Sequence, residues 1–575
     1  MTMEQVLAAV VVTALIAVLI QGRYSVAVVF STAAFLFYAS GLVDTDTLRR
    51  QLINPGVLTL GLLMLVAVVL NKSRALEYWT HRMLRGGYRF ALAKLIVAVS
   101  LHSALLNNTA VVASLIGPVK NAGKDASRLL MPLAYAATLG GAMTLIGTST
   151  NLLIDGFVQS EGMEGLHLLA PLPLGLVLLT VCGITMWLTL PHLLARVDIS
   201  EPPAADYFIE GRVTQDSSLV GLTVAQAGLR ELGSLYLVEI IRGEQLLAPV
   251  RPATVIRAED LLVFAGDVTR LDLLADFDGL TVIEDASGIP TDNLLEVMVS
   301  GESVLRNRTI RSVDFRARFD AAVLAVRRSS RYLRSNLASL PLEPGDILVL
   351  ATGPDFENRN NLQRNFIPVS RPIVGRFVAP WKSALALGGF ALVIALAGFG
   401  AIELLKGLAV LLAVYMVGGL VKVNELRRNI PWYLLITIVS ALVVSQVLAS
   451  TGLASLIVSG ALDTFSPGPH AAMIVILMMT ALMTALMTNN AAAALMFPMA
   501  VSISSSLGVD VMPFVMAVLF GASASFMTPH GYQTNLMVMA PGGYTFRDYL
   551  RAGAPVTLVY LAVAGWLLPV FFPFG

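Results

Sequence analysis

The chain has 575 residues, of which 56% are hydrophobic and 13% are charged, whereas about a quarter of the residues in an ordinary soluble chain are charged. The formal net charge of +1 gives no electrostatic basis for nucleic-acid binding, and the single cysteine excludes an internal disulfide and a cysteine-rich metal site. Most of the chain is therefore expected to lie in a lipid bilayer.

A transmembrane helix needs about 20 predominantly apolar residues. Stretches that meet or approach this length occur, in chain order, at 6–20, 24–43, 52–70, 129–154, 167–195, 383–402, 430–462 and 554–574. Two longer stretches, 464–509 and 511–546, contain no Lys, Arg, Asp or Glu. The first run has Glu4 in place of the basic start of a signal peptide, so we expect it to remain as a membrane helix. The pattern predicts an α-helical polytopic membrane protein.

A soluble insert separates the two apolar regions. Between about 197 and 374, charged residues recur every few positions and short apolar runs alternate with them, which predicts α/β structure. The insert is also a repeat, because the runs 219–223 and 259–266 return as 304–309 and 345–350. We expect four parts: a first transmembrane repeat at 1–195, two small domains at 196–281 and 282–375, and a second transmembrane repeat at 376–575.

One basic run within the insert consists of Arg327, Arg328, Arg331 and Arg334. We expect it to form a solvated surface or a surface that faces lipid headgroups.

The membrane parts repeat through their polar residues. The first part has Asn107-Asn108-Thr109 and then Gly147-Thr148-Ser149-Thr150-Asn151, and the second has Thr488-Asn489-Asn490 and then Gly531-Tyr532-Gln533-Thr534-Asn535. From Asn108 to Asn151 is 43 positions, and from Asn489 to Asn535 is 46. Order and spacing therefore both recur.

Loop charges indicate how the two repeats are related, because Lys and Arg accumulate on the cytoplasmic side of short membrane loops. In the first repeat the segments around the Asn motif are basic (Lys72, Arg74, Arg82, Arg85, Arg89, Lys120, Lys124, Arg128) and the loop after Asn151 is acidic (Asp155, Glu161, Glu164). In the second repeat the corresponding segments contain only Asp463 and Asp510, and the loop after Asn535 carries Arg547 and Arg551. This reversal predicts two repeats of inverted topology, an architecture that binds substrate near the bilayer midplane. Arg196, Arg371 and Arg376 then place the insert 196–375 in the cytoplasm.

The side chains of the two motifs carry no charge. A buried Asn or Thr in a membrane helix often only joins helices, but two matched motifs near Pro118, Pro498 and Pro529 suit broken helices and re-entrant hairpins. No Asp, Glu or Lys lies in either motif, so a proton relay has no carrier, and neutral oxygens fit Na⁺ better. Amide and hydroxyl groups can also bind an oxyanion. The residues thus predict sodium-coupled anion uptake.

These motifs resemble those of the divalent anion/sodium symporter family, which includes sodium:sulfate and sodium:dicarboxylate carriers. The family has a Ser-Asn-Thr triplet at a hairpin tip in each inverted repeat, and here the central residue of each triplet, Asn108 and Asn489, is kept. The stretch 528–538 is similar to the branch of the family that carries a soluble insert. The resemblance covers both membrane parts.

The resemblance implies two sodium sites and one substrate site. The sodium sites correspond to Ser103, Asn107 and Asn108 with backbone near Gly147, and to Thr484, Thr488 and Asn489 with backbone near Gly531. The substrate oxygens correspond to contacts with Asn108, Thr109, Asn489, Asn490, Thr148 and Thr534. Dicarboxylate carriers of the family have Thr as the third triplet residue in both copies. Asn490 departs from this pattern, which favours sulfate or a similar tetrahedral oxyanion.

The insert resembles two copies of the TrkA-C domain, the C-terminal domain of regulators of potassium conductance, with a Leu-Val-Gly-x-Thr opening at 219–223 and a Gly-Asp-x-Leu close at 345–348. The resemblance implies a regulatory or dimer-forming role, a homodimer, and a small cytoplasmic ligand, while a packing module without a ligand is the alternative. Neither copy contains a G-x-G-x-x-G turn, so dinucleotide binding is not expected.

We therefore predict a sodium-coupled symporter of a divalent oxyanion, with sulfate favoured over dicarboxylate, in the cell (inner) membrane. The alternatives are a cation channel or potassium-linked transporter gated by the insert, and another anion carrier or exchanger of the same architecture. No nucleophile, base and orienting group cluster in the sequence, so we expect neither an enzyme nor an organic cofactor.

Overall fold

The computed structural model describes residues 2–575 except 22–23, 71–86, 121–124, 197–207, 230–231, 233–234, 244, 248–249, 267–273, 275–276, 284–293, 302, 329–330, 334–336, 354, 357–358, 360–361, 370–379, 431, 459–467 and 530. Several charged residues used above lie outside the described residues: Lys72, Arg74, Arg82, Arg85, Lys124, Arg334, Arg371, Arg376 and Asp463, together with the side chain of Arg331. The chain divides into two compact units, which are described separately: Met1–Arg196, Arg376–Val538 and Thr545–Gly575 form one, and Val197–Gly375 with Met539–Tyr544 forms the other.

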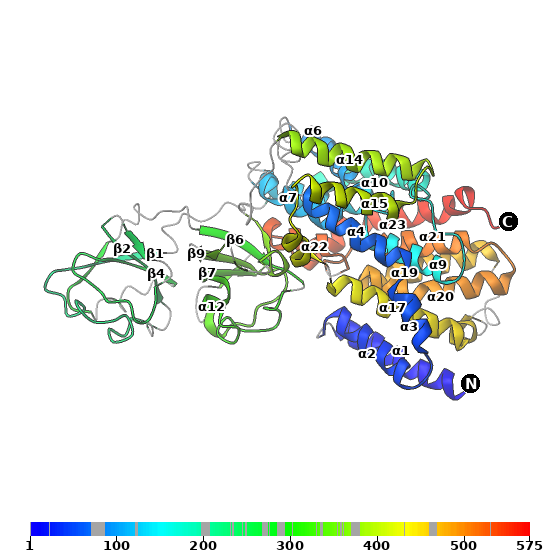
Figure 1. Ribbon diagram of the computed structural model, residues 1–575. Coiled ribbons are helices and arrows are strands. Elements are labelled where there is room, and N and C mark those ends of the chain that lie inside the picture. Colours follow the sequence, from blue (N-terminus) through cyan, green and yellow to red (C-terminus); the bar gives the residue numbers. More distant parts are fainter. Residues whose placement is uncertain are drawn as a thin grey trace. The chain divides into compact units, whose positions relative to one another are not determined.

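The first unit is helical (Figure 1). Before the insert come α1 (Met3–Gln21), α2 (Val26–Ala39), α3 (Thr45–Leu52), α4 (Pro55–Leu70), α6 (Tyr88–Ser103), α7 (Asn108–Lys120), α8 (Ala126–Gly141), α9 (Ser149–Ser160) and α10 (Leu172–Leu193). After the insert come α14 (Pro380–Gly398), α15 (Leu404–Val417), α16 (Val423–Asn429), α17 (Trp432–Ser450), α19 (Pro469–Leu486), α20 (Asn489–Leu507), α21 (Met512–Ser523), α22 (Gln533–Gly542) and α23 (Phe546–Phe571). Helices are the expected form, because a helix satisfies its own backbone hydrogen bonds in lipid.

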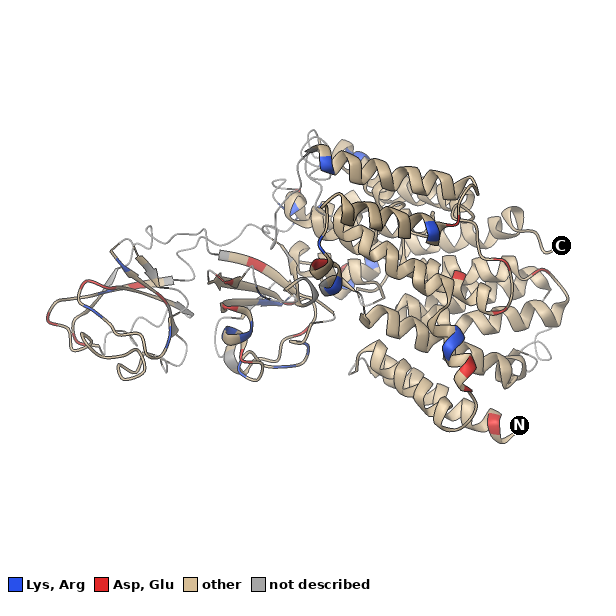
Figure 2. Cartoon of the chain, viewed as in Figure 1, with Lys and Arg blue, Asp and Glu red and all other residues tan. Residues whose placement is uncertain are grey.

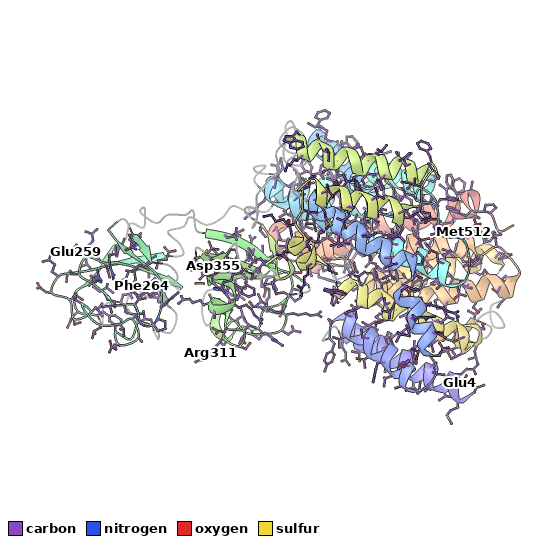
Figure 3. All side chains as sticks on the ribbon, in the orientation of Figure 1. Glu4, Glu259, Phe264, Arg311, Asp355 and Met512 are labelled. Atoms are coloured by element: carbon purple, nitrogen blue, oxygen red, sulfur yellow. The ribbon has the colours of Figure 1, made fainter. Side chains whose placement is uncertain are left out.

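Many of these helices have the length and surface of membrane spans. Among the described residues, eight helices are long and apolar enough to cross a bilayer. Charged residues are sparse along them (Figure 2). Side chains project outward around the helices (Figure 3), and many of the exposed ones are large and apolar. Val417 is 91% exposed and Trp566 is 70% exposed, which suits contact with lipid. The prediction of a multi-pass helical membrane protein is confirmed.

The apolar stretch 129–154 does not form one helix. α8 ends at Gly141 and α9 begins at Ser149, so the predicted stretch is broken in its middle. Within the break, the hydroxyl of Thr144 donates to the carbonyl of Ala104, and the side-chain amide of Asn151 donates to the carbonyl of Thr144. These bonds satisfy backbone carbonyls that a continuous helix would have satisfied itself.

Helices that precede the insert pack against helices that follow it, and these pairs are matched. α2 packs against α17, α15 packs against α4, and α10 packs against α23. We call the helices before the insert and those after it the two helix series. Counted along the chain, α2 has the same position in the first series as α15 has in the second, and α4 corresponds in the same way to α17. A two-fold relation between the two series produces this pattern of packing.

The second unit contains two sheets with the same strand order. The first consists of β1 (Phe208–Val213), β2 (Leu235–Arg242), β3 (Gln245–Leu247), β4 (Leu261–Gly266) and β5 (Leu280–Ile283), and the second of β6 (Leu294–Val299), β7 (Ala321–Arg328), β8 (Arg331–Leu333), β9 (Ile347–Thr352) and β10 (Phe366–Pro368). Their orders, β3-β2-β4-β1-β5 and β10-β6-β9-β7-β8, are the same order written from opposite edges. Strand β5 pairs with β1, so the first sheet continues past the expected boundary at 281.

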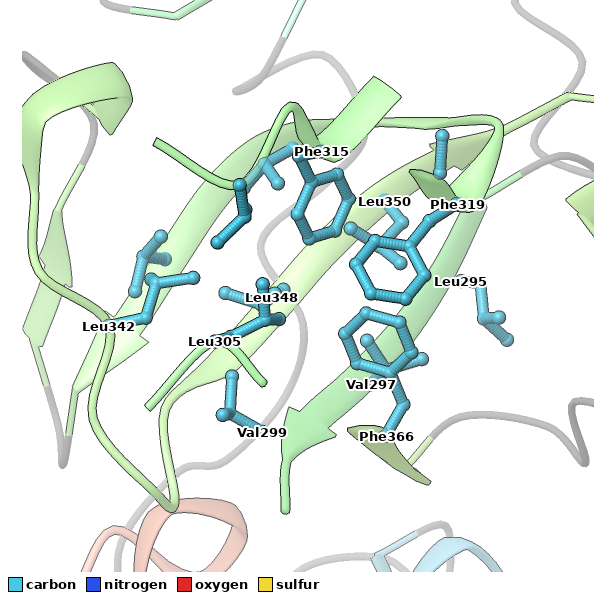
Figure 4. Close-up of a cluster of buried hydrophobic side chains, with 14 of the residues drawn as sticks. Leu295, Val297, Val299, Leu305, Phe315, Phe319, Leu342, Leu348, Leu350 and Phe366 are labelled. Atoms are coloured by element: carbon cyan, nitrogen blue, oxygen red, sulfur yellow. The ribbon is translucent and has the colours of Figure 1, made fainter. Parts of the chain in front are cut away.

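Each sheet has its own apolar core. Phe264 is fully buried in the first sheet, whereas Glu259 lies exposed at its rim (Figure 3). In the second sheet, Phe315, Phe319 and Phe366 pack over the strands together with Leu348 and other aliphatic side chains (Figure 4). The register shift in β2 near Leu237 recurs in β7 near Val323, so the two copies also share an irregularity.

A buried ion pair is repeated in the two sheets. Arg242 donates through Nε and Nη2 to Asp260 at 2.8 and 2.7 Å, and Arg328 donates in the same way to Asp346 at 2.8 Å for both bonds. Arg327 is 6% exposed. The expectation that this basic run is a solvated surface is therefore wrong for Arg327, because β7 buries its side chain, whereas the side chain of Arg328 is 31% exposed.

Candidate functional site

The first Asn motif lies where α6 stops and α7 starts. The side-chain amide of Asn108 is oriented so that its nitrogen donates to the hydroxyl of Ser103, to the carbonyl of Gly147 at 3.0 Å and to the carbonyl of Ala137 at 3.1 Å. Asn108 is 2% exposed and Ser103 is fully buried. The structure thus brings together three of the residues predicted for the first sodium site: Ser103, Asn108 and Gly147.

Two glycines make this close approach sterically feasible. A Cβ atom on Gly147 would lie 2.6 Å from the carbonyl oxygen of Gly141 and 2.8 Å from that of Ser103. A Cβ atom on Gly141 would lie less than 2.5 Å from the amide of Asn108. Any other residue at either position would push the broken segment away from the motif.

The second motif lies at the corresponding break between α19 and α20. A Cβ atom on Gly531 would lie 3.0 Å from the carbonyl oxygen of Thr484 and 2.8 Å from the hydroxyl of Thr528, with Ser525 next in contact at 3.3 Å. The predicted pair Thr484 and Gly531 is therefore adjacent, and Ser525 and Thr528 join it.

Equivalent hydrogen bonds occur within each of the two breaks. Asn151 donates to the carbonyls ten and seven residues earlier, and Asn535 does the same to Ser525 and Thr528. The hydroxyl of Thr144 donates to the carbonyl of Ala104, and the hydroxyl of Thr528 donates to the carbonyl of Ala485. Hydrogen bonds thus recur at equal or similar sequence offsets in the two motifs.

Direct hydrogen bonds connect the two motifs across the unit. The hydroxyl of Tyr532 lies 2.6 Å from the side-chain amide of Asn108 and 3.0 Å from the hydroxyl of Thr148. The hydroxyl of Thr150 donates to the side-chain oxygen of Asn490 at 2.7 Å. Since these residues stand at or beside the first residues of α7, α9, α20 and α22, four helix N-termini meet in one place.

Several buried oxygens in these segments have no hydrogen-bond partner. Within the part of the chain that the structure describes, these are Oγ1 of Thr484, Thr488 and Thr534, Oγ of Ser525, and Oδ1 of Asn151 and Asn535. Leaving one such group unsatisfied costs about 1–3 kcal/mol, so a group of them needs an explanation. Neutral oxygens at helix ends can serve as ligands of a hard cation, and they are all neutral here.

Other predicted residues take more peripheral positions. The side-chain oxygen of Asn107 accepts from the backbone N–H of Thr109, and its nitrogen lies 3.8 Å from the sulfur of Met64 in α4. Asn489 is partly exposed, and its side-chain oxygen accepts from the backbone N–H of Asn490. Among the described residues, no hydrogen bond joins Asn489 directly to Asn108.

Sequence reasoning missed Tyr532 and Thr150 as links between the motifs. Both lie inside the stretches that it compared, Tyr532 one residue from the predicted Gly531 and Thr150 two residues from the predicted Thr148. The available signal was the mismatch of Thr148 with Tyr532 in otherwise matching stretches.

Comparison with known proteins extends these observations. The family model described as citrate transporter (CitMHS) matches residues 9–517 and 434–574. A provisionally named sulfur deprivation response regulator of Chlamydomonas reinhardtii is 32% identical over 94% of this chain and 97% of that protein. An uncharacterized transporter of Synechocystis sp. is 31% identical over 80% of this chain and 78% of that protein.

A third relative is sodium/sulfate cotransporter 1 of Chlamydomonas reinhardtii, which is 29% identical over 64% of this chain and 44% of its own length. The family match spans well over half of the chain, and the described helices fit a multi-pass membrane transporter. The chain belongs to the citrate transporter family.

Proposed function

We propose that this protein is a sodium-coupled symporter of a small divalent oxyanion, with sulfate preferred over dicarboxylates. The observation that carries the proposal is the meeting of four helix N-termini, linked by the Asn108–Tyr532, Thr148–Tyr532 and Thr150–Asn490 hydrogen bonds. Helix N-termini attract anions through their unpaired N–H groups and their dipoles, and no fixed positive charge is required. Asn108, Thr109, Thr148, Asn489, Asn490 and Thr534 are the proposed substrate contacts.

Sodium binds, in this proposal, at the helix ends on the other side of each motif. α6 ends at Ser103 and α19 ends at Leu486, so carbonyl groups and negative dipole ends face the two breaks. Ser103, Asn107, Asn108 and Gly147 form one site, at which a bound cation would turn the oxygen of the Asn108 amide toward Ser103. Thr484, Thr488, Asn489 and Gly531 form the other. The unpartnered oxygens of Thr484 and Thr488 support the second site, because a cation would satisfy them.

Sulfate is the preferred substrate on two grounds. Asn490 replaces the Thr that dicarboxylate carriers of the resembling family have, and its oxygen binds Thr150. Sodium/sulfate cotransporters 1 and 2 of Chlamydomonas reinhardtii are 29% and 28% identical to this chain over 64% of its length.

The two helix series form inverted-topology repeats in the cell (inner) membrane, with the insert in the cytoplasm. The reversed loop charges and the exchanged packing of α2 on α17 and α15 on α4 support this arrangement. The insert consists of two TrkA-C-like domains that regulate transport or stabilise a homodimer, and the repeated strand order supports its being a tandem duplication.

Uptake by purified protein in proteoliposomes tests the function. Radiolabelled sulfate is expected to accumulate above equilibrium when Na⁺ is higher outside, but not under a K⁺ gradient of the same size, and succinate is expected to accumulate less. Uptake driven equally by either gradient, or absent for both anions, would contradict the proposal.

A further inference from the structure

Tyr532 breaks the match between the two motifs. The stretch Gly147-Thr148-Ser149-Thr150-Asn151 corresponds to Gly531-Tyr532-Gln533-Thr534-Asn535, so Tyr532 stands where the first half has Thr148. These two corresponding side chains meet, with their hydroxyl oxygens 3.0 Å apart. Corresponding residues of two repeats approach each other close to the pseudo-symmetry axis, so we place both side chains near the centre of the proposed site.

The hydroxyl of Tyr532 forms hydrogen bonds with polar groups of the first motif. Its single hydroxyl proton goes to the side-chain oxygen of Asn108, so the hydroxyl of Thr148 donates to Tyr532. The nitrogen of Asn108 donates to Ser103, Gly147 and Ala137. A substrate that contacts Asn108 and Thr148 must therefore share or displace their hydrogen bonds to Tyr532.

Among the described residues, no aromatic hydroxyl bonds to the second motif in the same way. Thr148, the counterpart of Tyr532, has a short side chain whose hydroxyl is already bonded to Tyr532, and the hydroxyl of Thr534 has no partner among the described residues. By contrast, Thr150, the counterpart of Thr534, binds Asn490. The proposed anion site, formed by the substrate contacts named above, is thus asymmetric, since the aromatic side chain of Tyr532 hydrogen-bonds to Asn108 and Thr148 of the first motif.

We infer that Tyr532 determines substrate size, because its ring narrows the proposed anion site beside Asn108 so that only a compact oxyanion fits between the two motifs. Sulfate carries its charge on one centre and needs one cluster of donors. A four-carbon dicarboxylate carries its two charges at opposite ends and needs donors in both halves. This inference rests on the proposed function and names the residue that sets its substrate class.

Substitution of Tyr532 tests the inference. Tyr532→Thr restores the residue of the other half and Tyr532→Ala removes the ring, and both are expected to lower the sulfate-to-succinate uptake ratio by about tenfold or more. Tyr532→Phe is the matched control, because it keeps the ring and removes only the hydroxyl, and it should keep the preference for sulfate. A wild-type ratio in both ring-removing variants would overturn the inference.

Competition on the wild-type protein provides a test that needs no variant. Unlabelled selenate, a tetrahedral dianion, should compete with labelled sulfate, and succinate at the same concentration should compete at least about tenfold less well. Equal competition would overturn the inference. Absence of all sodium-driven uptake by the wild type would instead refute the proposed function, so the two failures can be told apart.

Discussion

A hydroxyl group without a partner is the most informative feature at the scale of the residue. Thr484 is fully buried in α19 and its Oγ1 bonds to nothing among the described residues, whereas Oγ1 of Thr480, one turn earlier, donates to the carbonyl of Ile476. A threonine in a membrane helix normally makes the second kind of bond. The difference between these neighbours therefore indicates a ligand for Thr484.

Thr484→Val replaces this hydroxyl by a methyl group of similar size. Because no hydrogen bond is lost within the protein, thermal stability without sodium should stay the same or rise. The sodium concentration for half-maximal uptake should rise about tenfold, which corresponds to about 1.4 kcal/mol of lost binding.

Thr480→Val is the control, and its sodium dependence should match that of the wild type. The measurement is a sodium titration of uptake by the wild type, Thr484→Val and Thr480→Val. Identical sodium curves for Thr484→Val and the wild type would remove Thr484 from the site.

Helix breaks and close helix pairs govern the site at the scale of the element. α8 approaches α6 so closely at Gly140 that an added Cβ atom would lie 2.6 Å from the Cα atom of Ser100. At Gly521, on α21, an added Cβ atom would lie 2.8 Å from the carbonyl oxygen of Leu477 on α19. Both motifs are therefore held by helix pairs that meet backbone to backbone, as small residues allow in membranes.

Gly140→Ala and Gly521→Ala should each force their helix pair apart and lower the free energy of unfolding by about 1–3 kcal/mol. The effect should be larger at Gly140, where the nearest backbone atoms are closer. Gly61→Ala is the control, because the nearest atom to its added Cβ is a flexible Leu435 side chain at 3.7 Å. Thermal unfolding in detergent measures the difference, and equal midpoints for Gly140→Ala and Gly61→Ala would refute this packing argument.

Sequence patterns located some of these helices more accurately than others. Apolar length located α1, α2, α10 and α23 well, since a long apolar run has one favourable form in lipid. The same criterion joined α8 and α9, because the break at 142–148 is as apolar as its flanks, and what separates the helices is a set of tertiary hydrogen bonds from Thr144 and Asn151. Arg327 was misjudged for a similar reason, because burial depends on what packs over a strand.

The relation between the two helix series is the main feature at the scale of the whole molecule. The matched Asn motifs indicated a repeat from the sequence, and the hydrogen bonds of Asn151 and Asn535 recur at the same two offsets. Contacts between the halves through Tyr532 and Thr150 could not be predicted, because spacing along one repeat carries no information on what faces it from the other. Both halves contribute residues to the proposed site, since Tyr532 and Asn490 of one half hydrogen-bond to Asn108, Thr148 and Thr150 of the other.

The central claim is that one anion is held jointly by both motifs, and sodium-driven uptake of labelled sulfate by Asn108→Ala and Asn489→Ala tests it most directly. Asn429→Ala serves as the control, since the Asn429 amide only donates to the carbonyl of Glu425 within its own helix. We predict that each motif variant folds and reaches the membrane but loses sodium-driven uptake, while the control transports at the wild-type rate. Wild-type transport by both Asn108→Ala and Asn489→Ala would contradict the account.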